Sequence, residues 1–218
     1  MATTDLALLT GPEADELLRT ALHGAGGEVL AWRASQVDHQ PHRSTTVAYQ
    51  VRVRWPGGAV TEERLAARTG RVPAGALLLD DGDRRVGVWR FPHDPLLPGL
   101  AQAYDRRAVA RLLRDLGLGS GPVRLAVRAY RPGRRAVIEA TGRRGRVFLK
   151  VVRPHRVGAL HRRHRLLTDA GVPVPHSYGY TPDGLLALRA VPGRNLRDVV
   201  WVGGRVPTGR HLLSLLDR

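Results

Sequence analysis

The sequence contains no cysteine, one lysine, one methionine and two phenylalanines among its 218 residues. Without cysteine the chain can form neither a disulfide bond nor a thiolate metal site, and a cysteine nucleophile is excluded. No apolar run approaches the roughly 18 residues that a membrane-spanning helix needs. The N-terminal segment MATTDLALLTGPEADELL is acidic and lacks the basic start of a signal peptide. We therefore expect a soluble cytoplasmic protein with no membrane partner.

Positive charge is concentrated in the second half of the chain. The net charge is +16, from 35 basic and 19 acidic residues. Residues 1–120 hold 15 basic and 14 acidic residues, whereas residues 121–218 hold 20 basic and 5 acidic residues. A basic surface of this kind attracts polyanions such as nucleic acid, acidic lipid or the phosphates of a nucleotide. The change in charge also indicates a domain boundary near residue 120.

The hydrophobic pattern of the first half predicts a small α+β unit. Helical spacing is present in residues 12–23 and 105–116, and alternating apolar residues predict strands over 28–37 and 45–55. Further strand signals follow at 59–67, Leu77–Leu79 and Val86–Phe91, the last two flanking the hairpin signal Asp81-Gly82. The glycine-rich segment after residue 116 reads as a linker.

The second half is also rich in strand signals. Three alternating runs joined by tight turns are followed by a helical pattern and two short strands; these segments are 123–130, 136–140, 146–152, 155–169, 177–180 and 185–190. On strand 146–152, Phe148, Lys150 and Val152 share one face. The sequence therefore places the only lysine mid-strand between apolar neighbours.

Lys150 is a candidate functional residue because every other basic residue counted is arginine. Lysine is a compact point charge with three donors, whereas arginine is a planar fork. An unpaired buried cation is costly, and a bound phosphate would be a suitable partner. The turn at 131–135 offers backbone N–H groups and guanidinium groups, and Gly133 allows close approach of the backbone. The alternative interpretation is a solvated strand residue with no role.

The order of these segments resembles the small lobe of aminoglycoside phosphotransferase-like kinases, which share the protein-kinase fold. RPGRR with AVIEA resembles the phosphate-covering loop and second strand, and RVFLKVV resembles the third strand with its nucleotide-binding lysine. HRRHRLLTDAGVPVP resembles the following helix and exit segment, and LLALRAVPGRNLRDVV resembles the fifth strand, the hinge and the next helix. Residues 1–116 resemble, more loosely, the N-terminal cap of maltokinase-like members.

The resemblance implies an α+β fold in three parts. Residues 1–120 would form a cap of helices and an antiparallel sheet. Residues 121–192 would form a kinase-like small lobe, with a five-stranded antiparallel sheet and one helix. Residues 193–218 would be the hinge exit and the start of a large lobe that this chain lacks.

The resemblance also implies an ATP site. Lys150 would contact the α- and β-phosphates of ATP. Phe148 and Val137 would line the roof of the adenine pocket, and main-chain groups of Arg189 and Val191 would bind the adenine edge. The residues that would cover the phosphates are Pro132, Gly133, Arg134 and Arg135.

Two features of the family are missing. Helix 155–169 contains only Asp169 as an acid, so no helix glutamate is placed to pair with Lys150, and Glu139 is a weak candidate. No segment resembles the catalytic His-Gly-Asp loop or the metal-binding Asp, and His93-Asp94 precedes the lysine strand. Mg²⁺ would then be held by residues of another lobe. We expect the ATP-binding N-terminal portion of a small-molecule phosphotransferase, as a truncation, a fragmentary gene product or a degenerate relative, with little or no kinase activity alone.

Two other functions are compatible with the sequence. The basic second half favours a nucleic-acid-binding module, although aromatic residues for stacking on single strands are sparse there and no helix-turn-helix or zinc-finger pattern occurs. A non-catalytic interaction protein built on a kinase-like fold is the third reading. His161 and His164 have metal-ligand spacing, but the arginines around them disfavour a cation. The phosphate acceptor is left open by the sequence and includes antibiotics, sugars and other metabolites.

Overall fold

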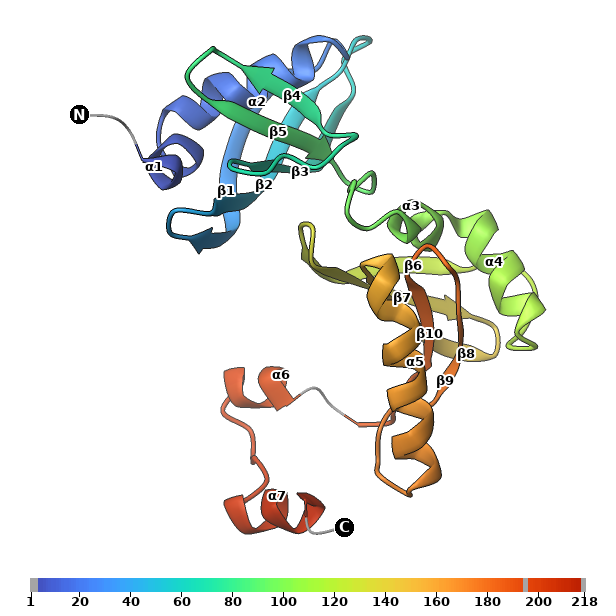
Figure 1. Ribbon diagram of the computed structural model, residues 1–218. Helices are drawn as coiled ribbons and strands as arrows, with labels where there is room; N and C mark the ends of the chain where they lie inside the picture. The colour runs from blue at the N-terminus through green and yellow to red at the C-terminus, as the bar shows by residue number, and fades with distance from the viewer. Residues whose placement is uncertain (1–3, 194–195, 217–218) are drawn as a thin grey trace.

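The computed structural model describes residues 4–193 and 196–216 and has an α+β fold (Figure 1). Within these residues there are two five-stranded antiparallel sheets with the same strand order, β1-β2-β3-β5-β4 and β6-β7-β8-β10-β9. The first sheet contains β1 (Glu28–Gln40), β2 (Ser44–Arg54), β3 (Val60–Arg68), β4 (Leu77–Asp80) and β5 (Arg85–Arg90). The second contains β6 (Arg124–Arg131), β7 (Arg135–Gly142), β8 (Gly145–Val152), β9 (Ser177–Tyr180) and β10 (Leu185–Arg189).

The first sheet is covered on one face by α1 (Asp5–Thr10) and α2 (Glu13–His23). Alternate residues of β2 face these helices and are fully buried, as the period of two predicts: Val47, Tyr49, Val51 and Val53. The hydroxyl of Tyr49 donates to the carbonyl oxygen of Leu9 at 2.6 Å, which ties the sheet to the end of α1. The sequence pattern does not predict α1. This six-residue helix begins after Thr4, whose side-chain oxygen accepts the N–H of Ala7 and so caps the helix.

The second sheet is covered on both faces. On one face, α3 (Gly99–Tyr104) and α4 (Arg106–Asp115) bury Val109 and Leu113 in one cluster with Ile138 and Leu149. On the other face, α5 (Pro154–Asp169) packs Val157 against a smaller cluster of Val152, Leu186 and Leu188. The sheet therefore separates α4 from α5.

The position of α4 differs from the sequence expectation, which assigned residues 105–116 to the first unit and a boundary to residue 120. The apolar face of α4 packs on the second sheet instead. Gly117, Gly119 and Gly121 have positive φ angles of 69°, 130° and 104°, so the segment reverses the chain tightly from α4 into β6. The segment is therefore a turn within the second unit. The change in net charge near residue 120 does not coincide with a boundary between two hydrophobic cores.

The two units meet at the segment that follows β5. Asp94 in this segment is 2% exposed. Its carboxylate accepts the N–H of Gly133 at 2.7 Å, the hydroxyl of Tyr130 at 2.9 Å and the N–H of Leu96 at 2.9 Å. Trp89 of β5 donates its indole N–H to the same Tyr130 hydroxyl at 3.0 Å. Burial raises the pKa of Asp94, and these donors oppose the rise.

The C-terminal helices α6 (Leu196–Trp201) and α7 (Gly209–Leu216) lie apart from both sheets in Figure 1. Arg194 and Asn195, in the segment predicted to leave the hinge, lie outside the described residues. None of the helices in the described part of the chain combines the length and apolar character needed to cross a bilayer.

Candidate functional site

Lys150 lies in the middle of β8, paired with Val137 on β7 and Leu186 on β10. Its side chain is half-buried, and Phe148 lies two residues away on the same face. Leu149 and Val151, which flank Lys150 in the sequence, are fully buried on the opposite face, under α3 and α4. The lysine therefore stands on the sheet face that also carries α5.

The ammonium group of Lys150 is in an unfavourable electrostatic setting. Burial lowers its pKa, and the positive charge of nearby Arg135 lowers the pKa further. Among the residues described, no carboxylate lies within the 4.0 Å of an ion pair with Lys150. The site thus presents a cation that is partly desolvated and has no carboxylate partner within the described ranges.

Glu139, the candidate partner from the sequence, is paired with a different residue. Its carboxylate lies 2.8 Å from Nε of Arg128, and its side chain is only 8% exposed. This ion pair is the main cause that lowers the pKa of Glu139. In the sheet register Glu139 lies opposite Phe148, whereas Val137 lies opposite Lys150. The Glu139 carboxylate therefore forms its ion pair with Arg128, and no ion pair between Glu139 and Lys150 is observed.

A cleft of about 1170 Å³ opens beside Phe148, between the sheet and the chain after β10. The sheet contributes the apolar side chains of Ala129, Val137 and Phe148 together with the charged side chains of Arg128, Glu139 and Arg146. The exit segment and α6 contribute the opposite side: Val191, Pro192, Gly193, Asp198, Trp201 and Val202. The two cations Lys150 and Arg135 follow Val137 and Phe148 along the same sheet face. Neither cation is among the residues that line the cleft, so both lie beside it on the sheet.

The turn predicted to cover phosphates is bound to the first unit. Gly133 has φ 64°, its N–H donates to Asp94, and its carbonyl oxygen accepts Nε of Arg153 at 2.9 Å. A Cβ at this position would lie 3.0 Å from Cδ1 of Leu96. Pro132 is buried as well. The backbone N–H groups of this turn were predicted to bind a phosphate. The N–H of Gly133, however, already donates to the Asp94 carboxylate.

The two arginines of this turn, Arg134 and Arg135, interact with different parts of the protein. Arg134 forms an ion pair with Asp38 of the first unit at 3.1 Å. Arg135 is exposed and close enough to Lys150 to lower its pKa. Of the four predicted phosphate-covering residues, Arg135 is therefore the one that shares the electrostatic environment of Lys150. The Asp94 contact was missed because 39 residues separate it from Gly133.

The two predicted hinge positions differ in their hydrogen bonding. The main-chain N–H of Arg189 donates to the carbonyl oxygen of His176 at 2.8 Å, so it holds β10 to the segment before β9. Val191 lines the cleft and is exposed. Its main-chain N–H donates no hydrogen bond to any residue in the described ranges. Of the two predicted hinge positions, Val191 is thus the one whose N–H has no hydrogen-bond acceptor among the described residues.

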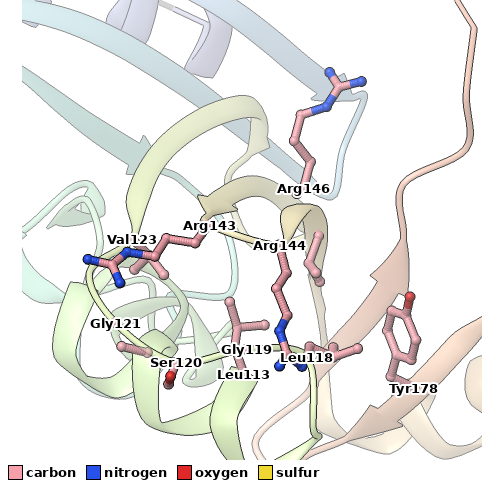
Figure 2. Close-up of a pocket in the computed structure, with 14 residues that line it drawn as sticks. Leu113, Leu118, Gly119, Ser120, Gly121, Val123, Arg143, Arg144, Arg146 and Tyr178 are labelled. Carbon is pink, nitrogen blue, oxygen red and sulfur yellow. The ribbon is translucent and has the colours of Figure 1, made fainter.

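A second concave surface lies between α4, the loop after it and the β7–β8 turn, and Figure 2 shows its lining residues. The side chain of Arg144 extends across Gly119, where an added Cβ would lie 3.3 Å from Cδ of the arginine. The positive φ of Gly119, which brings the loop under Arg144, is not visible in the spacing of the sequence.

The described residues contain no group of three or more His, Cys, Asp or Glu side chains that could hold a metal ion. The two helix histidines have protein partners: Nδ1 of His161 contacts Oγ of Ser177 at 2.8 Å, and Nδ1 of His164 contacts the carbonyl oxygen of Pro175 at 2.8 Å. Neither ring has a neighbouring carboxylate that would complete a ligand set.

No protein-family model matches the sequence. A search of the curated proteins gives no match either. The functional interpretation therefore depends on the sequence motifs and on the geometry around Lys150.

Proposed function

We propose that residues 121–192 form the ATP-binding small lobe of a small-molecule phosphotransferase similar to the aminoglycoside phosphotransferase and maltokinase-like kinases. The observation that carries the proposal is a half-buried lysine with no carboxylate partner among the described residues, on the same sheet face as Val137 and Phe148, which line a large cleft. The sheet order β6-β7-β8-β10-β9, with α5 placed between β8 and β9, is compatible with the kinase-like small lobe that the motifs suggest.

The cleft would hold the adenine end of a nucleotide, and the two cations beside the cleft would hold its phosphate end. Val137 and Phe148 would pack against the adenine ring, and the N–H of Val191 would donate to its edge. The triphosphate would be held by Lys150 and Arg135, because its negative charge offsets the cost of desolvating the ammonium group. On this proposal Pro132, Gly133 and Arg134 shape the phosphate end through their contacts with the first unit, and Arg189 positions the hinge strand.

The described residues do not fit Mg²⁺, because no carboxylates gather beside the cations. We therefore derive no transfer step, and we expect this chain to bind ATP without releasing phosphate. In the proposed enzyme the metal and the acceptor would be bound by residues of another lobe. A role of this kind belongs in the cytoplasm, where ATP is available.

The test is titration of the full chain with a non-hydrolysable ATP analogue by isothermal calorimetry. Lys150→Met keeps most of the aliphatic stem and removes the charge, and we expect it to weaken binding at least about tenfold, a loss of about 1.4 kcal/mol. Arg163→Met on α5 is the matched control, because Arg163 is exposed and it also loses one charge. Equal affinity of the wild type and Lys150→Met would contradict the proposal. No binding by the wild type would favour a non-catalytic interaction protein.

A further inference from the structure

The sheet face opposite Lys150 carries an extended surface of arginines, which we call the arginine groove. Its two hollows, of about 80 and 430 Å³, share Ala110, Ser120, Gly121 and Val123 and are therefore continuous. Its arginines come from α4, from the β7–β8 turn and from the start of β8: Arg106, Arg107, Arg111, Arg114, Arg143, Arg144 and Arg146. Figure 2 shows Arg143 and Arg144 beside the loop 119–121.

The charge of the arginine groove is not neutralised by the protein. Arg114 lies 3.8 Å from Asp115, and in the part of the chain that the structure describes the other six have no carboxylate within 4.0 Å. Four arginines of the first unit, by comparison, form ion pairs: Arg19, Arg54, Arg85 and Arg90. Arginines without a carboxylate within 4.0 Å also occur elsewhere in the described chain, for example on α5, but the groove gathers several of them around two adjoining hollows.

The shape of the groove indicates an extended ligand. Arg107, Arg111 and Arg114 follow a spacing of four and three residues, so they lie on one side of α4. From Arg106 to Arg114 the helix rises about 12 Å, which is longer than a single phosphate group. None of the large hydrophobic residues exposed on the described surface belongs to the groove. A partner held there must supply negative charge along its length rather than apolar area.

We propose that the arginine groove binds the phosphate backbone of double-stranded nucleic acid without reading its sequence. Guanidinium groups bind phosphates through paired hydrogen bonds, and a row of them along a helix matches a row of phosphates better than it matches one small anion. Single strands are disfavoured because Tyr178 is the only aromatic residue in the lining of the two hollows. The proposal does not depend on ATP binding, since the groove and Lys150 lie on opposite faces of the sheet.

The test measures fluorescence anisotropy of a short labelled DNA duplex with the full chain at increasing salt. If about four phosphates are neutralised, affinity falls by about two orders of magnitude between roughly 50 and 200 mM salt. The triple variant Arg107→Gln, Arg111→Gln and Arg143→Gln should bind at least about tenfold more weakly and reduce the logarithmic salt slope by about three. Lys150→Met should bind the duplex as the wild type does, so failure of the ATP site would not affect this result.

The matched control removes three arginines from α5, on the other side of the sheet: Arg156→Gln, Arg162→Gln and Arg163→Gln. All three are exposed, so the net charge changes equally while the groove stays intact. Equal losses in the two triple variants would show attraction by total charge and overturn the proposal, as would the absence of duplex binding at low salt. Tighter binding of polyglutamate than of the duplex would assign the groove to an acidic protein and also overturn it. If the groove triple variant does not fold, Arg111→Gln alone should reduce the slope by about one.

Discussion

At the scale of single residues, the alternation of β8 was enough to predict the face on which Lys150 lies, because a strand sends successive side chains to opposite sides. The lack of a helix glutamate to pair with it was also visible in the sequence. What the sequence did not reveal is the pairing of Glu139 with Arg128, which lie on neighbouring strands, and the proximity of Arg135. Both follow from strand register, which no local pattern defines.

The lowered pKa of Lys150 predicts opposite pH trends for stability and for ATP binding. Between this lowered pKa and the ordinary value of 10.5, the unfolded chain holds more protons than the folded chain. The contribution of Lys150 to the free energy of unfolding therefore rises with pH through that window. The affinity for an ATP analogue falls through the same window, because the ammonium group loses its charge.

Calorimetry and urea denaturation, each repeated from neutral pH to pH 10.5, would check these trends. Comparison with Lys150→Met removes the contribution of the tyrosines, which titrate in the same range. A wild type whose ATP affinity changes with pH no more than that of Lys150→Met would show that the ammonium group is not a ligand.

At the scale of elements, the structure confirms the strands predicted over 123–130, 136–140 and 146–152, and the helix predicted over 155–169, to within two residues. Alternation over whole strands and helical spacing over four turns are strong signals. The helices α1 and α3 were missed because six residues are too few to establish a period. The placement of α4 was missed because its apolar face fits either sheet by pattern alone.

The turn between β9 and β10 gives a prediction about Gly184. Its φ is 95°, and a Cβ there would lie 2.1 Å from the carbonyl oxygen of Val152, where the turn packs on the end of β8. Gly82 has a similar φ of 93° with nothing within 4 Å of an added Cβ. We expect Gly82→Ala to cost about 1–2 kcal/mol of unfolding free energy from backbone strain. Gly184→Ala should cost about 1–3 kcal/mol more from the clash. Equal losses in urea denaturation would mean that the turn does not pack as described.

At the scale of the whole molecule, two sheets with the same strand order are joined by a short segment rather than by a broad shared core. The joint is polar and buried, with Asp94 accepting donors from both its own segment and the turn at Gly133. Phe91 adds edge-to-face contacts with Tyr104 and Tyr130. The first unit is thereby fixed to the turn beside the proposed phosphate end of the cleft.

This joint predicts the effect of Asp94→Ala. The substitution leaves the buried Gly133 N–H and the Tyr130 hydroxyl without their acceptor, and each such loss costs about 1–3 kcal/mol. We expect the variant to be destabilised by about 2–5 kcal/mol and to unfold in two transitions, since the first unit would separate from the second before either melts. Three of the four tryptophans, Trp32, Trp55 and Trp89, lie in the first unit, so tryptophan fluorescence reports mainly that unit, whereas circular dichroism reports both. The exposed Asp169→Ala is the control and should leave one transition; a single coincident transition in Asp94→Ala would argue against a coupling role.

The most direct test of the central claim uses the fact that Lys150 is the only lysine. Protein grown with ¹³C-labelled lysine gives one ε-methylene NMR signal, which reports the charge and surroundings of this single ammonium group. We predict that saturating ATP shifts this signal and raises the pKa of Lys150, because a triphosphate stabilises the charged form. A signal whose position and titration are the same with and without ATP would contradict the account.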